Sequence, residues 1–134
     1  MARAIQITVD AAGPRKLAEF WCDVLGYVEQ PPPAGFDTWE AALDAFGIDQ
    51  SDPDRAFAIV DPDGVGPRVF FLKVPEGKTA KNRMHLDVHV DPAELHARAA
   101  ELVALGATRV GEFDEPEGHW ITLLDPEGNE FCLH

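Results

Sequence analysis

The chain has 134 residues, 46% of them hydrophobic and 26% charged, which fits one folded domain rather than a disordered segment. Its 24 acidic residues outnumber its 11 basic ones, and the net charge of −13 disfavours nucleic acids and anionic membranes as partners. Two cysteines are too few for a disulfide framework, no apolar run approaches the ~20 residues that span a bilayer, and the first residues lack the apolar core of a signal peptide. We therefore expect a cytoplasmic protein with no nucleic-acid partner and no membrane partner.

Two elements are predicted at the start of the chain. Residues 5–10 alternate between apolar and polar side chains, which predicts a half-buried strand with Gln6 and Thr8 on its polar face. Residues 14–25 place apolar side chains three and four positions apart, the spacing of a helix with one buried face. Gly26 suits the end of that helix, because glycine readily adopts the left-handed backbone conformation.

A short helix is predicted over residues 36–47, in a segment that has no counterpart later in the chain. This insertion carries Phe36, Trp39 and Phe46, which need a place to pack. They either pack on the domain's own sheet or form a lid over a ligand cleft. If they form a lid, the Trp39 ring is expected beside His85.

The same pattern of elements returns from residue 83. Residues 83–90 alternate again, with His85, Asp87 and His89 on the polar face, and Asp91 is predicted to cap the helix that follows. In the last strand Phe131 and Leu133 are predicted to face the helices, so the opposite face carries Glu130, Cys132 and His134.

A repeated turn supports an internal duplication. The sequence Asp61-Pro-Asp-Gly in the first half matches Asp125-Pro-Glu-Gly in the second, and each joins two predicted strands. We predict a single domain, residues 1–134, built from two β-α-β-β-β modules. Module one covers residues 1–76, a linker covers 77–82, and module two covers 83–134.

Four segments carry a resemblance to a known superfamily: Asp10-Ala-Ala-Gly-Pro14 with Leu17-Ala-Glu-Phe-Trp21, Val74-Pro-Glu76, Lys81-Asn-Arg-Met-His-Leu-Asp87, and Asp125-Pro-Glu-Gly-Asn-Glu-Phe-Cys-Leu133. Their order resembles the vicinal oxygen chelate superfamily, which includes glyoxalases, bleomycin-resistance proteins and extradiol dioxygenases. Within it, the chain is most similar to small actinobacterial-type glyoxalase-like domain proteins. The resemblance implies an α+β fold, in which two tandem βαβββ modules with curved, antiparallel-type sheets form a ligand cup.

The resemblance also implies where a metal would bind. Metal-dependent members take one ligand from the first and one from the last strand of each module, and Gln6 and His85 match the two first-strand positions. Cys132 stands where such members usually have glutamate, and its counterpart in module one falls near Leu72, which cannot coordinate a metal. We therefore predict no bound cofactor; a divalent metal, if one binds, would have Gln6, His85, Glu130 and Cys132 available as ligands.

The polar faces carry residue types that could take part in catalysis. His85 or His89 beside Asp87 has the residue types of an acid–base pair, so these three are the catalytic candidates. Neighbouring side chains on one strand face, however, are more often simply salt-linked or solvated. Cys132 is not expected to be a nucleophile, because no positive charge or helix N-terminus that would lower its pKa is visible.

The predicted function is the binding of a small organic molecule in the cup, with an incomplete metal-ligand set. The predicted ligand-binding residues are Gln6, Thr8, Trp39, His85, Asp87, Glu130 and Cys132. The alternative is a metal-dependent or acid–base lyase, isomerase or dioxygenase acting on a small oxygenated substrate, so the sequence leaves open whether the protein is an enzyme. It also leaves open whether the modules pair within one chain or swap between two chains of a homodimer.

Overall fold

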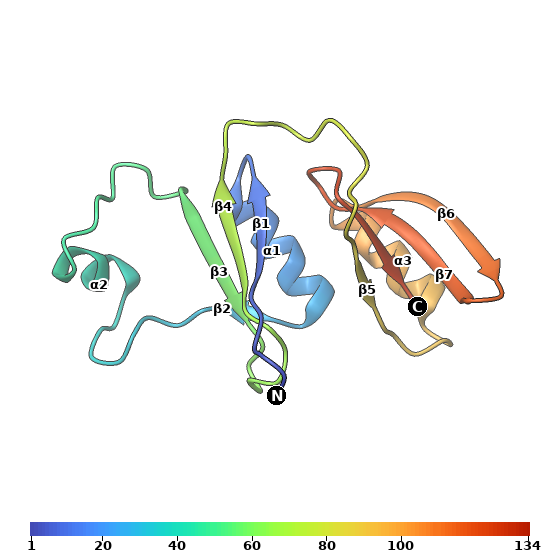
Figure 1. The fold of residues 1–134 in the computed structure, drawn as a ribbon, viewed down its shortest axis with the longest axis horizontal. Helices are drawn as coiled ribbons and strands as arrows, with labels where there is room; N and C mark the ends of the chain where they lie inside the picture. Colours follow the sequence, from blue (N-terminus) through green and yellow to red (C-terminus); the bar gives the residue numbers. More distant parts are fainter.

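The computed structural model describes residues 1–134 and contains two four-stranded sheets, one in each half of the chain (Figure 1). The elements of module one are β1 (Ile7–Ala11), α1 (Pro14–Leu25), β2 (Val28–Glu29), α2 (Trp39–Ala45), β3 (Ala56–Val60) and β4 (Val69–Lys73). Those of module two are β5 (Leu86–Val88), α3 (Leu95–Ala104), β6 (Thr108–Glu115), β7 (Gly118–Leu124) and β8 (Glu130–Leu133). None of the helices is long and apolar enough to cross a bilayer.

The strand order is the same in both modules and confirms the predicted α+β fold of two modules. The first sheet has the order β1-β4-β3-β2 and the second the order β5-β8-β7-β6. The sheets are mixed rather than wholly antiparallel, because the first strand of each module lies parallel to the last and the other pairs are antiparallel. The helix and strands between them supply the crossover that a parallel pair requires.

Strand register makes equivalent positions of the two modules visible. Thr8 pairs with Phe70 in module one, and Asp87 pairs with Cys132 in module two. The counterpart of Cys132 is therefore Phe70 and not Leu72, the position that the resemblance implied. Phe70 cannot ligate a metal either, so the absence of a ligand at this position stands.

Two helix ends show how local sequence acts. α1 ends at Gly26, which has a φ of 69° in the left-handed region, as predicted. The predicted start of the helix after Asp91 is wrong: α3 begins at Leu95 rather than directly after Asp91. The Asp91 carboxylate instead accepts a hydrogen bond from the Ala93 N–H at 2.9 Å, and this local turn competes with the helix.

One continuous core joins the modules through α1. Leu17, Phe20 and Trp21 are buried on this helix, and the Trp21 ring lies 5.0 Å from the ring of Phe131 on β8. In Figure 1, α1 lies between β1 and the second sheet, so the two sheets do not meet edge to edge. Each sheet turns its apolar side, marked by Phe71 and Phe131, toward this core.

The opposite side of each sheet is called here the open face. In module one it carries Gln6, Thr8 and Arg68, and in module two it carries the residues that alternate with Phe131, such as Cys132 and His134. The polar face that strand alternation predicted is therefore present on both sheets. These faces are where a functional site is sought.

Candidate functional site

The densest group of reactive side chains lies on the open face of module two. His85 Nδ1 lies 3.0 Å from Asp87 Oδ1, and the other oxygen of Asp87 lies 3.6 Å from His134 Nε2. Cys132 is the register partner of Asp87, and donor atoms of His85, Asp87 and Cys132 all lie within 4.8 Å of one another. Three of the predicted site residues thus converge on one point.

Cys132 is the buried member of this group, with 7% of its surface exposed. Its sulfur lies 3.4 Å from the Thr122 hydroxyl of the neighbouring strand. Burial raises the pKa of the Cys132 thiol above its ordinary value, and nearby Asp87 acts in the same direction. The thiol therefore stays protonated near neutral pH, which is unfavourable for a nucleophile.

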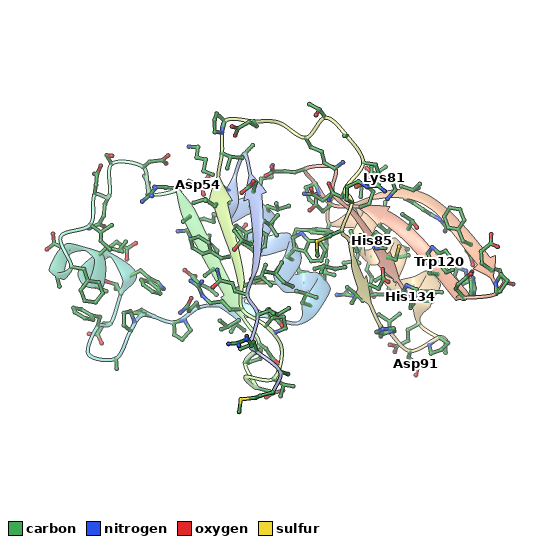
Figure 2. The ribbon with its side chains drawn as sticks, in the orientation of Figure 1. Asp54, Lys81, His85, Asp91, Trp120 and His134 are labelled. Atoms are coloured by element: carbon green, nitrogen blue, oxygen red, sulfur yellow. The ribbon has the colours of Figure 1, made fainter.

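Stacked rings continue the site along the same face. Phe113 stacks on Trp120 with ring centroids 5.8 Å apart, Trp120 stacks on His134 at 5.8 Å, and His89 lies 5.5 Å from His134. Figure 2 shows His85, Trp120 and His134 on the second sheet. Trp120 and Phe113 were not among the predicted site residues, although alternation in β7 places Trp120 on the same face as Thr122.

Glu130 does not join this group. Its carboxylate accepts a hydrogen bond from the Asn82 N–H at 2.9 Å and lies 3.3 Å from Lys78 Nζ, both from the linker. Partial burial opposes ionisation, but these partners outweigh it and lower the pKa of Glu130. Glu130 fastens the linker to β8.

The open face of module one has its own polar network, centred on Arg68. The side-chain amide nitrogen of Gln6 donates to the Thr8 hydroxyl at 3.2 Å, and the side-chain oxygen of Gln6 accepts from Arg68 Nη1 at 2.6 Å. Arg68 Nε donates to the Gln30 side-chain oxygen at 2.6 Å. Neither Arg68 nor Gln30 was among the predicted site residues, because only the pairing of β1 with β4 brings Arg68 next to Gln6.

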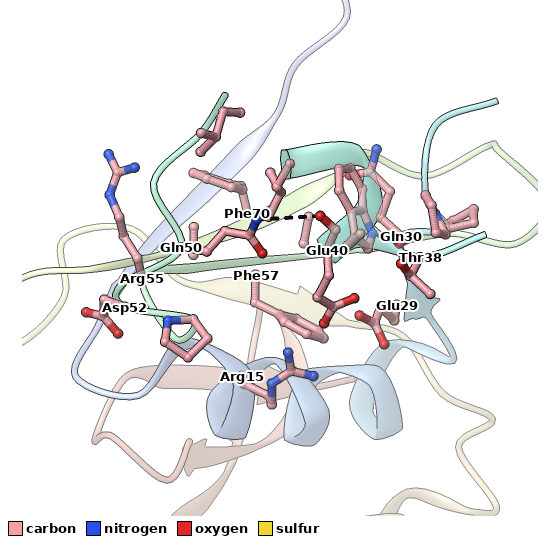
Figure 3. Close-up of a pocket in the computed structure, with 18 of the residues that line it drawn as sticks. Arg15, Glu29, Gln30, Thr38, Glu40, Gln50, Asp52, Arg55, Phe57 and Phe70 are labelled. Carbon is pink, nitrogen blue, oxygen red and sulfur yellow. Dashed lines mark hydrogen bonds between the residues drawn. The ribbon is translucent and has the colours of Figure 1, made fainter. Parts of the chain in front are cut away.

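Trp39 lies at a pocket of about 680 Å³ between the insertion and the first sheet (Figure 3). The Trp39 indole N–H donates to the backbone oxygen of Gln30 at 2.7 Å. All residues lining this pocket belong to module one. Within one chain, Trp39 therefore does not lie beside His85, and the predicted contact between them is not found. Phe36 does not line the pocket; it packs against Phe46 with ring centroids 5.4 Å apart.

A second ionisable cluster, here called the back-face cluster, lies on the helix side of module two. It comprises His96 of α3, Glu112 of β6 and His119 of β7. The two imidazoles lie 2.8 and 2.7 Å from the same Glu112 oxygen, and Arg109 donates to the other oxygen at 2.8 Å. Hydrogen bonds from His119 and His96 lower the pKa of Glu112 to about 2.

Known proteins with a similar sequence pattern or a similar fold place the chain in a family. A family model for a glyoxalase-like domain matches residues 6–134. The fosfomycin resistance protein FosX from Mesorhizobium loti matches at a TM-score of 0.69 and 16% identity, over 100% of this chain and 91% of that chain. A mutant of FosX from Listeria monocytogenes, complexed with Mn(II) and 1S,2S-dihydroxypropylphosphonic acid, matches at 0.70 and 14%, over 100% and 90%.

A glyoxalase/bleomycin resistance protein/dioxygenase family enzyme from Burkholderia phytofirmans PsJN matches at a TM-score of 0.66 and 16% identity, over 96% of this chain and 94% of that chain. Identities this low establish a shared fold and not a shared activity. No curated protein matches the chain significantly.

Proposed function

Because this chain belongs to the glyoxalase-like domain family of the vicinal oxygen chelate superfamily, we propose that it binds a small organic molecule on its polar open faces. The observation that carries the proposal is the convergence of His85, Asp87 and Cys132 beside the stacked Trp120. Hydrogen-bonding groups next to an aromatic wall are the usual composition of a small-molecule site.

We further propose that the cup is completed by a second copy of the chain. The contacts of Gln6 lie within module one and those of His85 lie within module two, and α1 packs between the two sheets. A second copy would place the open face of one module against that of the other. Light scattering after size exclusion should then give the mass of a dimer; a monomer that binds ligand fully would contradict this part.

The test of the binding function is a thermal-shift screen with a panel of small aromatic acids, amines and phenols. Compounds that raise the melting temperature of the wild type should lose most of that effect in His85→Ala and in Asp87→Asn. His96→Ala, which alters the back-face cluster only, is the matched control and should respond like the wild type. Compounds that stabilise all four proteins equally would contradict a site at His85.

A second candidate function is acid–base or metal-assisted catalysis, favoured by the 3.0 Å contact between His85 and Asp87. A carboxylate in this position orients an imidazole and holds it ready to accept a proton. The donors His85, Asp87 and Cys132 fit a borderline ion such as Zn²⁺ better than Mg²⁺, because one donor is nitrogen and one is sulfur. When bound, such an ion would polarise an oxygen atom of the substrate.

A further inference from the structure

We propose that Arg68 anchors the carboxylate of an aromatic ligand that lies in the pocket beneath the insertion. The inference rests on the proposed binding function and names a ligand class and an anchoring residue for module one. Three features support it: an arginine without an acidic partner, an aromatic wall fixed beside it, and a pocket of suitable size.

Arg15, Arg55 and Arg68 line the pocket, and none of them belongs to an ion pair; Arg68 is the one whose guanidinium is held by side-chain hydrogen bonds. Its guanidinium donates only to the neutral amide oxygens of Gln6 and Gln30, each at 2.6 Å. A guanidinium has five N–H donors, so three remain after these two bonds. The two glutamines fix its orientation without neutralising its charge, which leaves it suited to an anion.

Aromatic groups flank this charge. The guanidinium carbon of Arg68 lies 4.9 Å from the centre of the Phe70 ring, on the open face of β4. Trp39 is held by its bond to the backbone oxygen of Gln30, the same residue whose side chain holds Arg68. Gln30 thus joins the cation to the aromatic wall of the insertion, and both line one pocket.

The pocket is large enough for a ring system. Its volume of about 680 Å³ falls within the roughly 300–1,000 Å³ of pockets that hold small molecules. Figure 3 shows it between α2 and α1, with Phe57 and Phe70 from adjacent strands among its walls. Phe57 is the register partner of the core residue Phe71 and so lies on the other face of the sheet from Phe70. An aromatic ligand would therefore stack against Phe70 and Trp39 while its charged group meets Arg68.

Acidic side chains in the same pocket restrict the ligand's charge. Asp52 is paired with Lys73, but Glu29 and Glu40 have no ion pair and lie toward Arg15 in Figure 3. These carboxylates and the net charge of −13 oppose a multiply charged anion. A single carboxylate on an aromatic ring meets this condition better than a phosphate ester.

The test compares two probes that share one ring system, 1-naphthoate and neutral 1-naphthamide, by isothermal titration calorimetry. Wild type should bind 1-naphthoate more tightly than 1-naphthamide. Arg68→Gln should weaken 1-naphthoate roughly 10- to 100-fold and leave 1-naphthamide unchanged, because only the charged contact is lost. Trp39→Leu should weaken both probes alike, and Arg109→Gln, which removes a cation from the back-face cluster outside the pocket, should change neither.

Arg68→Lys guards against a folding defect, since it keeps the charge and should retain part of the preference for 1-naphthoate. Equal affinities of wild type for the two probes, or an unchanged 1-naphthoate affinity in Arg68→Gln, would overturn the anchor. Failure of wild type to bind 1-naphthoate would overturn it as well. The wider binding function is judged separately, by the panel screen with His85→Ala.

Discussion

The Trp21 indole N–H donates to the Asp125 carboxylate at 3.0 Å, and both residues are buried. Trp21 belongs to α1 of module one and Asp125 to the turn between β7 and β8 of module two. The next acidic residue of that turn, Glu127, accepts hydrogen bonds from the backbone N–H groups of Ala12 and Gly13, just before α1. The repeated turn of module two therefore ties the two modules together.

Replacing Asp125 should destabilise the whole domain. Besides Trp21, Asp125 accepts from the backbone N–H groups of Glu127 and Asn129 and from the Asn129 side chain. Asp125→Ala leaves these donors unpaired next to the core, so we expect the free energy of unfolding to fall by roughly 3 kcal/mol.

Asp61 provides the matched control for that experiment. It occupies the equivalent turn of module one and accepts from the N–H groups of Asp63, Val65 and Gly66, but it makes no bond to the other module. Urea denaturation should show a smaller loss for Asp61→Ala than for Asp125→Ala. Equal losses would mean that the tie between modules contributes nothing beyond the turn itself.

Metal content gives a second prediction. Protein purified without added metal should contain far less than one equivalent by elemental analysis, because Cys132, one of the three clustered donors, holds its proton. Added Zn²⁺ or Mn²⁺ should raise the melting temperature only slightly. A ligand that binds the folded state, at a concentration one hundred times its Kd, would instead add about 2.7 kcal/mol to the free energy of unfolding. Stoichiometric metal that is lost in His85→Ala but kept in His96→Ala would reverse this expectation and favour the enzyme.

Alternation in sequence predicted much of the candidate site, because it fixes which side of a strand each residue occupies. His85, Asp87 and Cys132 come from two parallel strands of one module, and their shared face followed from parity alone. Arg68 could not be found this way. Its partners Gln6 and Gln30 lie 62 and 38 residues away, and only the fold brings them together.

The arrangement of the modules was also beyond the sequence. It depends on Phe20 and Trp21 of α1 packing on Phe131 of β8, and the helical pattern shows only that these residues are buried somewhere. The start of α3 was missed because the side chain of Asp91 is able either to cap a helix or to close a turn.

Thiol reactivity gives a third prediction. Burial raises the pKa of both thiols, Cys22 and Cys132, and carboxylates near each of them add to the effect. Native protein should therefore react with iodoacetamide at neutral pH much more slowly than free cysteine does, and unfolding in urea should release two reactive thiols. Rapid labelling of Cys132 in the native protein, located by mass spectrometry, would restore it as a candidate nucleophile.

The back-face cluster predicts a defined pH dependence of stability. Contacts with His119, His96 and Arg109 lower the pKa of Glu112 from its ordinary value of 4.5 to about 2 in the folded chain. A carboxyl whose pKa is lower when folded contributes stability that is complete above the unfolded value and is lost as pH falls toward the folded value. Wild type should therefore be more stable than Glu112→Gln above pH 4.5, and this advantage should shrink as pH falls from 4.5 toward 2. Urea denaturation of both proteins across this range measures the advantage, and Glu101→Gln on the exposed side of α3 is the control. An advantage that does not change with pH would show that the Glu112 carboxylate is not held by its three partners.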